Sequence, residues 1–206
     1  MKKVGIIDYG CGNIASLQNA LEKIECRFGH VSSPDQFDLY DAYILPGVGA
    51  FKHGMESLID NGIDLALLES VKKGKKLLGI CLGMQLLFED SSEGGRQKGL
   101  GLIPGNIRKI DFFKKNCRVP HMGWNNLNID EVDNVGLFRD IDKESSYYFV
   151  HSYYATTKKH ISQVTTSYCE NNILAACEYE NISGVQFHPE KSHDAGLKLL
   201  DNFCNK

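Results

Sequence analysis

The stretch Gly79-Ile80-Cys81-Leu82-Gly83 sets a cysteine between two glycines where the pattern of the chain changes. Residues 76–80 form an apolar run that predicts a buried strand, and residues 82–89 have the pattern of a helix. A sharp strand-to-helix turn needs small flanking residues, exposes its central side chain and leaves a backbone N–H free to stabilise an anion. We therefore predict a nucleophile elbow, with Cys81 as a catalytic thiolate.

The other six cysteines lack such a setting. They are Cys11, Cys26, Cys117, Cys169, Cys177 and Cys204. They show neither a CxxC pair nor regular spacing, which argues against a metal site or a disulfide framework. A buried cysteine usually acts as a small apolar filler, so we assign them structural or incidental roles. An odd number of scattered cysteines also fits a reducing compartment, in which all of them stay thiols.

Length and composition indicate one globular domain that spans residues 1–206, with 42% hydrophobic residues. The apolar run at residues 4–7 is too short for a signal peptide, and no later stretch approaches a membrane span. We therefore predict a cytoplasmic protein that does not bind membranes. A net charge of -3 gives no broad electrostatic footprint for nucleic acid, so we predict no nucleic-acid partner.

Helices and strands alternate in the first half of the chain. The apolar patterns predict strands at residues 3–8, 26–32 and 43–45, and helices at residues 13–25 and 54–73. From about residue 105, short runs of β-branched and aromatic residues predict hairpins. These strands fall at residues 147–150, 161–166 and 173–177, before a final helix at residues 194–203. The order predicts an α/β fold with a mainly parallel sheet flanked by helices, and antiparallel strands in the C-terminal half.

A thiol with an ordinary pKa of about 8.5 is mostly protonated at neutral pH, so a nucleophilic cysteine needs a base beside it. The run Gly184-Val-Gln-Phe-His-Pro-Glu190 ends a short apolar strand with an imidazole, a rigid proline and a carboxylate. A carboxylate bonded to one ring nitrogen leaves the other nitrogen to take the thiol proton. We predict His188 as the base and Glu190 as its orienting acid. His193 has a spacing seen in zinc sites, but no CxxC pair completes a ligand set, so we predict no metal.

A glycine-containing turn follows the strand predicted at residues 43–45. Its sequence is Leu45-Pro-Gly-Val-Gly-Ala-Phe51, and it lies at the carboxyl edge of the expected sheet, where ligands of such folds bind. Glycines there let peptide N–H groups turn toward a substrate oxygen. The residues alone leave an ordinary strand-to-helix turn equally open.

Together the elbow, the His-Pro-Glu turn and this loop resemble the class I glutamine amidotransferases, which carry a Cys-His-Glu triad on a flavodoxin-like α/β fold. Further motifs are similar to the glutaminase subunits of imidazole glycerol phosphate synthases. These motifs are Asp8-Tyr-Gly-Cys-Gly-Asn13, Pro46-Gly-Val-Gly49, Pro120-His-Met-Gly-Trp-Asn125, His151-Ser-Tyr-Tyr154 and Gln186-Phe-His-Pro-Glu-Lys-Ser192. The resemblance covers nearly the whole chain. As in those subunits, a valine separates the two glycines of the loop.

The resemblance implies hydrolysis of L-glutamine to glutamate and ammonia without a cofactor. Cys81 would attack the side-chain amide, His188 would carry the proton, and Glu190 would orient His188. The backbone N–H groups of Val48, Gly49 and Leu82 would hold the oxyanion. The residues expected to bind the substrate are Gln85, Ser152 and Tyr153.

The same resemblance implies a partner, a cyclase subunit with a TIM-barrel fold, in a heterodimer that serves histidine biosynthesis. The ammonia would pass to that subunit, and the chain alone would be nearly inactive because its oxyanion loop needs the partner. The implied interface residues are Asn13, Met122, Trp124, Tyr148 and Lys191. From the residues alone, Met122 and Trp124 could equally fill a core, and Asn13 could cap the first helix.

Three alternatives remain open at this point. A paralogous subunit could supply ammonia to a sugar amidotransferase of surface-glycan synthesis with the same motifs. A nucleotide-binding protein is a second alternative, because Gly10-Cys-Gly-Asn-Ile-Ala15 formally matches the dinucleotide fingerprint. Its acidic partner would be Asp35, which follows a proline in an expected loop. The third alternative is a non-catalytic interaction module on the same fold.

Overall fold

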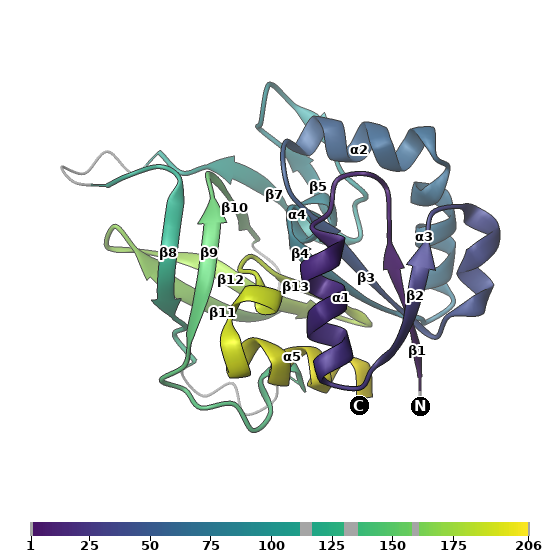
Figure 1. Cartoon of the computed structure of the whole chain (residues 1–206). Coiled ribbons are helices and arrows are strands. Elements are labelled where there is room, and N and C mark those ends of the chain that lie inside the picture. The colour runs from purple at the N-terminus through teal and green to yellow at the C-terminus, as the bar shows by residue number, and fades with distance from the viewer. Residues whose placement is uncertain (1, 112–116, 130–135, 158–160, 206) are drawn as a thin grey trace.

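A seven-stranded sheet forms the centre of the molecule in the computed structural model, which describes residues 2–111, 117–129, 136–157 and 161–205 (Figure 1). The strand order is β11-β12-β13-β4-β3-β1-β2. The bounds are β1 Lys3–Ile7, β2 Arg27–Val31, β3 Ala42–Gly47, β4 Lys76–Cys81, β11 Ser162–Tyr168, β12 Asn171–Tyr179 and β13 Ile182–Val185. The five strands from β13 to β2 are parallel, and β12 and β11 add an antiparallel edge.

The parallel part of the sheet has the strand order of flavodoxin-like folds, since β2, β1, β3, β4 and β13 follow one another across it. Its centre is buried on both faces, and all six residues of β3 are buried. The predicted fold class is confirmed. The carboxyl ends of β1, β3 and β4 meet at one edge, and the loops that follow these strands therefore lie close together.

Helices cover both faces of this sheet (Figure 1). Their bounds are α1 Ile14–Lys23, α2 Phe51–Asp60, α3 Ile63–Lys72 and α5 His193–Asn205. Leu17 of α1 and Leu199 of α5 belong to the core on one face. Met55 of α2 and Leu67 of α3 belong to the core on the other face. Among the described residues, no helix is long and apolar enough to cross a membrane.

The single helix predicted at residues 54–73 is wrong, because two helices occupy this region. They meet at Gly62, whose φ of 66° is left-handed and ends the first helix. The apolar pattern continues across this turn because both helices face the same core, so the pattern alone concealed the break.

The helix predicted at residues 82–89 is also shorter than expected. The helix α4 spans Leu82–Leu86, and the chain then enters strand β5, Phe88–Ser91. The strand-rich part of the chain therefore begins well before residue 105. All five residues of α4 are buried, so a helical pattern of exposed and buried positions could not mark its end.

Two smaller sheets complete the fold. The second sheet has the order β10-β7-β5-β6, and the third is a pair of antiparallel strands, β8 and β9. Their bounds are β6 Gln97–Lys98, β7 Ile103–Lys109, β8 His121–Asn126, β9 Ser146–His151 and β10 Tyr153–Thr156. Three 3₁₀ turns are η1 Pro34–Leu39, η2 Gly136–Phe138 and η3 Pro189–Lys191. The β8–β9 pair lies beside β11 (Figure 1).

The expectation that all seven cysteines are thiols is wrong for two of them. Cys117, just before β8, forms a disulfide with Cys169, in the turn between β11 and β12. Their sequence separation of 52 residues gave no signal, because only the packing of β8 on β11 brings the two Cα atoms to 5.6 Å. The other five cysteines are free and buried.

Candidate active site

Cys81 sits at the sharp turn between β4 and α4. Its φ of 55° and ψ of -111° are unusual for a residue with a side chain, and such strain is characteristic of nucleophile elbows. Close packing of β3 against α4 requires the glycines. A Cβ on Gly83 would lie 1.8 Å from the carbonyl oxygen of Leu45, and one on Gly47 would lie 2.6 Å from the Gly83 nitrogen. The elbow predicted from the two glycines is present.

His188 and Glu190 form a buried pair at the carboxyl end of β13. The His188 Nδ1 lies 2.7 Å from the Glu190 Oε1, and the two side chains are 2% and 4% exposed. A carboxylate only accepts, so Nδ1 carries the hydrogen. The Nε2 atom is buried and makes no hydrogen bond to a described residue. It is therefore the nitrogen that remains for exchange of a proton with a thiol.

The charge state of His188 depends on both of its neighbours. Burial alone would lower the pKa of His188, but the Cys81 thiol and the Glu190 carboxylate together raise it to about 10. At neutral pH this favours an imidazolium at His188, which is the charge that a cysteine nucleophile needs beside its sulfur.

Gln186, which follows β13 directly and lies two residues before His188, also contacts the sulfur of Cys81. Its Nε2 lies 3.8 Å from the Cys81 Sγ, and its Oε1 accepts a hydrogen bond of 2.9 Å from the Gln85 Nε2. The Sγ itself lies 3.9 Å from the carbonyl oxygen of Val150. An amide N–H aimed at the sulfur supports negative charge there.

A cavity of about 370 Å³ opens at this point, within the size range of small-molecule sites. Eight predicted site residues line it, namely Val48, Gly49, Cys81, Leu82, Gln85, Ser152, Tyr153 and His188. They come from the loops after β3 and β4, from α4, from the connection between β9 and β10, and from the end of β13. Glu190 does not line the cavity but supports His188 from behind.

The loop predicted to hold the oxyanion, which contains Val48 and Gly49, is held in a particular conformation. The backbone N–H of Val48 donates a hydrogen bond of 2.7 Å to the carbonyl of Cys11, in the loop after β1. In this conformation the Val48 N–H is not available to a substrate oxygen. Gly49 has a φ of 103°, which a glycine adopts without strain, so the loop has conformational freedom next to the cavity.

Four residues that line the cavity were not predicted: Glu93, Pro120, Val150 and His151. Glu93 follows β5, and its Oε2 accepts a hydrogen bond of 2.8 Å from the N–H of Phe51, at the start of α2. No sequence signal marks it, because a glutamate between serines and glycines reads as an exposed loop. His151 adjoins Ser152 in a motif that was recognised, and its position there was the available signal.

Four of the five predicted interface residues gather on one surface. Trp124 of β8 packs edge-on against Tyr148 of β9 at 5.8 Å between ring centroids. The Lys191 Nζ lies 5.8 Å from the centroid of the Tyr148 ring. Met122 is 62% exposed and Trp124 is 44% exposed, so the alternative that both fill a core is wrong. His193 stacks on Trp124 at 4.7 Å, with ring planes 5° apart.

Asn13 lies at the N-cap position of α1, and α1 packs against η3, which carries Lys191. The side chain of Asn13 makes no capping hydrogen bond, so the capping alternative is not supported.

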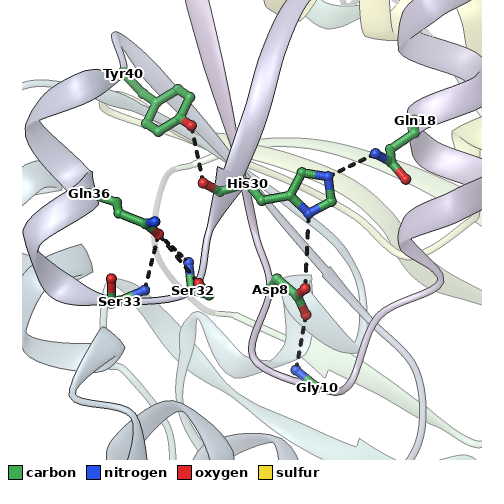
Figure 2. Close-up of polar contacts among 8 residues, drawn as sticks. All are labelled: Asp8, Gly10, Gln18, His30, Ser32, Ser33, Gln36 and Tyr40. Atoms are coloured by element: carbon green, nitrogen blue, oxygen red, sulfur yellow. Dashed lines mark hydrogen bonds and ion pairs between the residues drawn. The ribbon is translucent and has the colours of Figure 1, made fainter.

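The loop that suggested a nucleotide site is closed by its own contacts (Figure 2). The N–H of Gly10 donates to the Asp8 Oδ1 at 3.4 Å, and the ring of His30 lies between Asp8 and Gln18. The Nδ1 of His30 is 4.0 Å from the Asp8 Oδ2, and its Nε2 is 2.8 Å from the Gln18 Nε2. Asp35 lies in η1 rather than at the end of β2. The dinucleotide fingerprint is not supported.

Comparison with known proteins assigns the chain to a family. The family model of the glutamine amidotransferase class-I proteins matches residues 5–206. The HisH subunit of imidazole glycerol phosphate synthase from Sulfurimonas denitrificans is 45% identical over 97% of this chain and 96% of its own length. The HisH subunits from Wolinella succinogenes and Bacillus licheniformis are 43% and 42% identical, and each alignment covers at least 94% of either chain.

Solved structures agree at the level of the fold. A crystal structure of a glutamine amidotransferase superposes with a TM-score of 0.73 at 17% identity, over 97% of this chain and 98% of that one. The structure of PurLQS from Thermotoga maritima contains a chain with a TM-score of 0.71 at 20% identity, over 100% of this chain and 99% of that one. The chain therefore belongs to the class I glutamine amidotransferase family and, within it, to the family of the HisH subunits.

Proposed function

We propose that this chain is the glutaminase subunit of an imidazole glycerol phosphate synthase, which hydrolyses L-glutamine and passes the ammonia to a cyclase subunit. The observation that carries the proposal is the buried contact of 2.7 Å between His188 and Glu190, beside the cavity that contains Cys81. This arrangement supplies a nucleophile, a base and an orienting acid to a site of suitable size. The 45% identity to a HisH subunit supports the choice of pathway.

In the first half of the reaction, the Cys81 thiolate attacks the side-chain carbonyl carbon of glutamine. The resulting oxyanion is stabilised by the N–H of Leu82, at the start of α4, and by the N–H groups of Val48 and Gly49 once their loop has turned. The Nε2–H of His188 then gives its proton to the amide nitrogen. The C–N bond breaks, ammonia leaves, and a thioester remains on Cys81.

In the second half, the neutral His188 takes a proton from a water molecule, which attacks the thioester. The C–S bond breaks, glutamate leaves, and the thiolate and the imidazolium are restored. Throughout, the Glu190 carboxylate keeps Nδ1 protonated and Nε2 directed at the reacting atoms. One water molecule is consumed for each glutamine, and no cofactor takes part.

The cavity also has groups suited to the amino-acid end of glutamine. Glu93 contributes a carboxylate to the cavity wall, and we assign it the α-ammonium group of the substrate. Gln85, Ser152 and Tyr153 lie along the same wall and are assigned to the remaining polar atoms. The Gln85 Nε2 is already bound to the Tyr153 carbonyl at 3.0 Å, which fixes the direction of its amide.

The partner that we propose is a cyclase subunit with a TIM-barrel fold. At neutral pH free ammonia becomes ammonium, which is not nucleophilic, so a dry interface preserves the reactive form. The exposed Met122 and Trp124, with Tyr148 and Lys191 beside them, give a partner an aromatic and cationic surface next to the active site. Asn13 lies on α1, which adjoins this surface through η3.

The test is reconstitution with a purified cyclase subunit, with glutamate and imidazole glycerol phosphate measured in the same reaction. We expect both products in equal amounts, and neither product from Cys81→Ala. Glutamate formed without imidazole glycerol phosphate, but in the presence of a sugar amidotransferase, would place the chain in glycan synthesis instead. Glutamine hydrolysis that survives Cys81→Ala would reject the nucleophile.

A further inference from the structure

A buried pair of histidines lies at the wall of the cavity, with one ring in the wall and the other behind it. His121 is the first residue of β8 and His151 is the last residue of β9, and the antiparallel register places them opposite each other. They are 1% and 6% exposed. The His121 Nδ1 lies 2.9 Å from the His151 Nε2. His151 lines the cavity, whereas His121 is not among the residues of its wall.

The hydrogen bonds fix the tautomer of both rings. The His151 Nδ1 lies 2.8 Å from the carbonyl oxygen of Tyr153, and a carbonyl only accepts, so this nitrogen carries a hydrogen. In a neutral ring the His151 Nε2 is then an acceptor, and the His121 Nδ1 must be its donor. Burial lowers the pKa of His121 and lowers that of His151 to about 3, so both rings are neutral.

The last acceptor in this series of hydrogen bonds is the Tyr153 carbonyl, which belongs to the proposed substrate site. The carbonyl of Tyr153 also accepts the Nε2–H of Gln85 at 3.0 Å. Two donors, one from α4 and one from β9, thus hold a single peptide group between them. Ser152 and Tyr153 both line the cavity, so the orientation of this peptide sets the shape of the wall that faces glutamine.

The ring of His121 is itself held in place by aromatic neighbours. It stacks on Tyr168 of β11 at 3.9 Å between centroids and on Phe149 of β9 at 4.7 Å. The Tyr168 hydroxyl donates to the carbonyl of Arg118, and the next residue after Tyr168 is Cys169, which is bonded to Cys117. The direction of the His121 Nδ1–H is therefore set by packing outside the active site.

We propose that His121 is a positioning residue for glutamine: it donates to His151, holds that ring in the orientation in which its Nδ1–H binds the Tyr153 carbonyl, and so shapes the substrate site without touching the substrate. This inference rests on the proposed glutaminase function. If the donor is lost, one of the two hydrogen bonds that orient the His151 ring is gone, and the ring can turn away from the Tyr153 carbonyl. A loosened wall weakens the binding of glutamine more than it slows the chemistry at Cys81.

Two substitutions test the hydrogen-bond donor and the aromatic ring of His121 separately. His121→Phe keeps an aromatic ring between Tyr168 and Phe149 but removes the hydrogen. His121→Asn gives up the ring but can supply an amide N–H near the former Nδ1. Each variant is purified in complex with the cyclase subunit, and kcat and KM for glutamine are measured. Thermal unfolding of each chain and the rate at which iodoacetamide alkylates Cys81 report on folding and on the nucleophile separately.

For His121→Phe we expect the KM for glutamine to rise about tenfold or more, because a buried acceptor is left unpaired, while kcat stays within about threefold. His121→Asn should recover most of the lost affinity. Equal KM values in His121→Phe and the wild type would overturn the inference. An equal rise in both variants would also overturn it, because the ring and not its hydrogen would then be what matters.

Nitrogen-15 NMR of the histidine side chains tests the same inference without any activity. In the wild type we expect the hydrogens of His151 and of His121 on Nδ1, with the His151 Nε2 shift of a hydrogen-bonded acceptor, and in His121→Phe the Nε2 shift of an acceptor that has lost this donor. A wild-type His151 that carries its hydrogen on Nε2 would refute the arrangement. If the wild-type complex hydrolyses no glutamine, the proposed function fails, and the NMR result still decides whether His121 donates to His151.

Discussion

His188 is buried, and yet its pKa lies above that of a free imidazole. Burial works against its charge, but the adjacent Cys81 and Glu190 outweigh burial and raise the pKa of His188 to about 10. The proton that the reaction needs is therefore already on the histidine when glutamine arrives.

Replacing Glu190 by glutamine tests this arrangement. Glu190→Gln keeps the size of the side chain but removes the charge, and its amide can present N–H where Nδ1 of His188 needs an acceptor. We expect kcat to fall by roughly 10³-fold or more, as expected when a catalytic histidine loses its orienting carboxylate. The measurement is glutaminase activity of the complex, with Glu89→Gln as the control, because Glu89 is an exposed residue within β5.

The same pKa predicts how stability depends on pH. Since the pKa of His188 is about 10 in the folded chain and about 6.5 when unfolded, protonated His188 stabilises the fold fully below pH 6.5. That contribution is lost as the pH rises toward 10. We therefore expect the difference in free energy of unfolding between wild type and His188→Gln to shift against the wild type from pH 6 to pH 10, measured by urea denaturation. A difference that does not change with pH would contradict the raised pKa.

Gly83 is required by contact distance. A methyl group at this position would overlap the carbonyl oxygen of Leu45, which belongs to the rigid strand β3. We expect Gly83→Ala to lower the free energy of unfolding by about 2 kcal/mol or more, and to displace Cys81 from β3. Gly136→Ala is the matched control, because nothing lies within 4 Å of its added Cβ, and a change within about 0.5 kcal/mol is expected. Equal effects of both substitutions would show that the carbonyl of Leu45 can move away from the added methyl group.

Among the secondary-structure elements, β8 and β9 connect the active site with the expected partner surface. One side of this pair presents Trp124 and Tyr148 outward, and its end carries the buried His121 and His151. The segment that leads into β8 is tied to the turn after β11 by the disulfide. The position of this pair of strands is thus set covalently as well as by packing.

The disulfide makes a simple prediction about thiols. The unreduced chain unfolded in denaturant should react with a thiol reagent at five cysteines, because Cys117 and Cys169 are bonded and the other five are free. Reaction at seven would mean that the bond is absent.

Cys117→Ser should lower the free energy of unfolding by about 2 to 4 kcal/mol under oxidising conditions, because the disulfide no longer constrains the unfolded chain. Under reducing conditions the same substitution should have little effect.

At the scale of the whole molecule, the proposed catalytic side chains are already in a productive arrangement, whereas the proposed oxyanion loop is not. His188 and Glu190 are already paired, whereas the N–H of Val48 is bound to the carbonyl of Cys11. Turning that N–H toward the substrate requires this bond to break. A partner docked on the neighbouring exposed surface is in a position to compensate for its loss.

We therefore expect the isolated chain to hydrolyse glutamine slowly and the cyclase subunit to raise kcat by about 10²-fold or more, the effect of one oxyanion donor. If kcat is the same with and without the partner, the loop needs no change.

Trp124→Ala should weaken association, measured by calorimetric titration, without lowering the melting temperature, because Trp124 is 44% exposed. Leu65→Ala, which changes a side chain 70% exposed on α3, is the control and should leave association unchanged.

Much of the fold and of the site was predictable, and the residues that were missed have a common cause. Cys81, His188 and Glu190 stand in short motifs whose local geometry makes their chemistry recognisable. Glu93 does not, because its place in the cavity depends on the packing of its loop on the start of α2. The break at Gly62 was missed since two helices that face one core share one apolar pattern.

The sequence by itself determined the elbow at Cys81, the alternation of helices and strands in the first half of the chain and the family, because each depends on contiguous residues or on alternation along the chain. Only the tertiary structure decided which groups act on one another across distant segments. It joined Cys117 to Cys169, bound the N–H of Val48 to Cys11, and set His121 against His151. The physical reason is that bonds of these kinds depend on distances of a few ångströms between segments, and such distances follow from packing and leave no pattern in either segment alone.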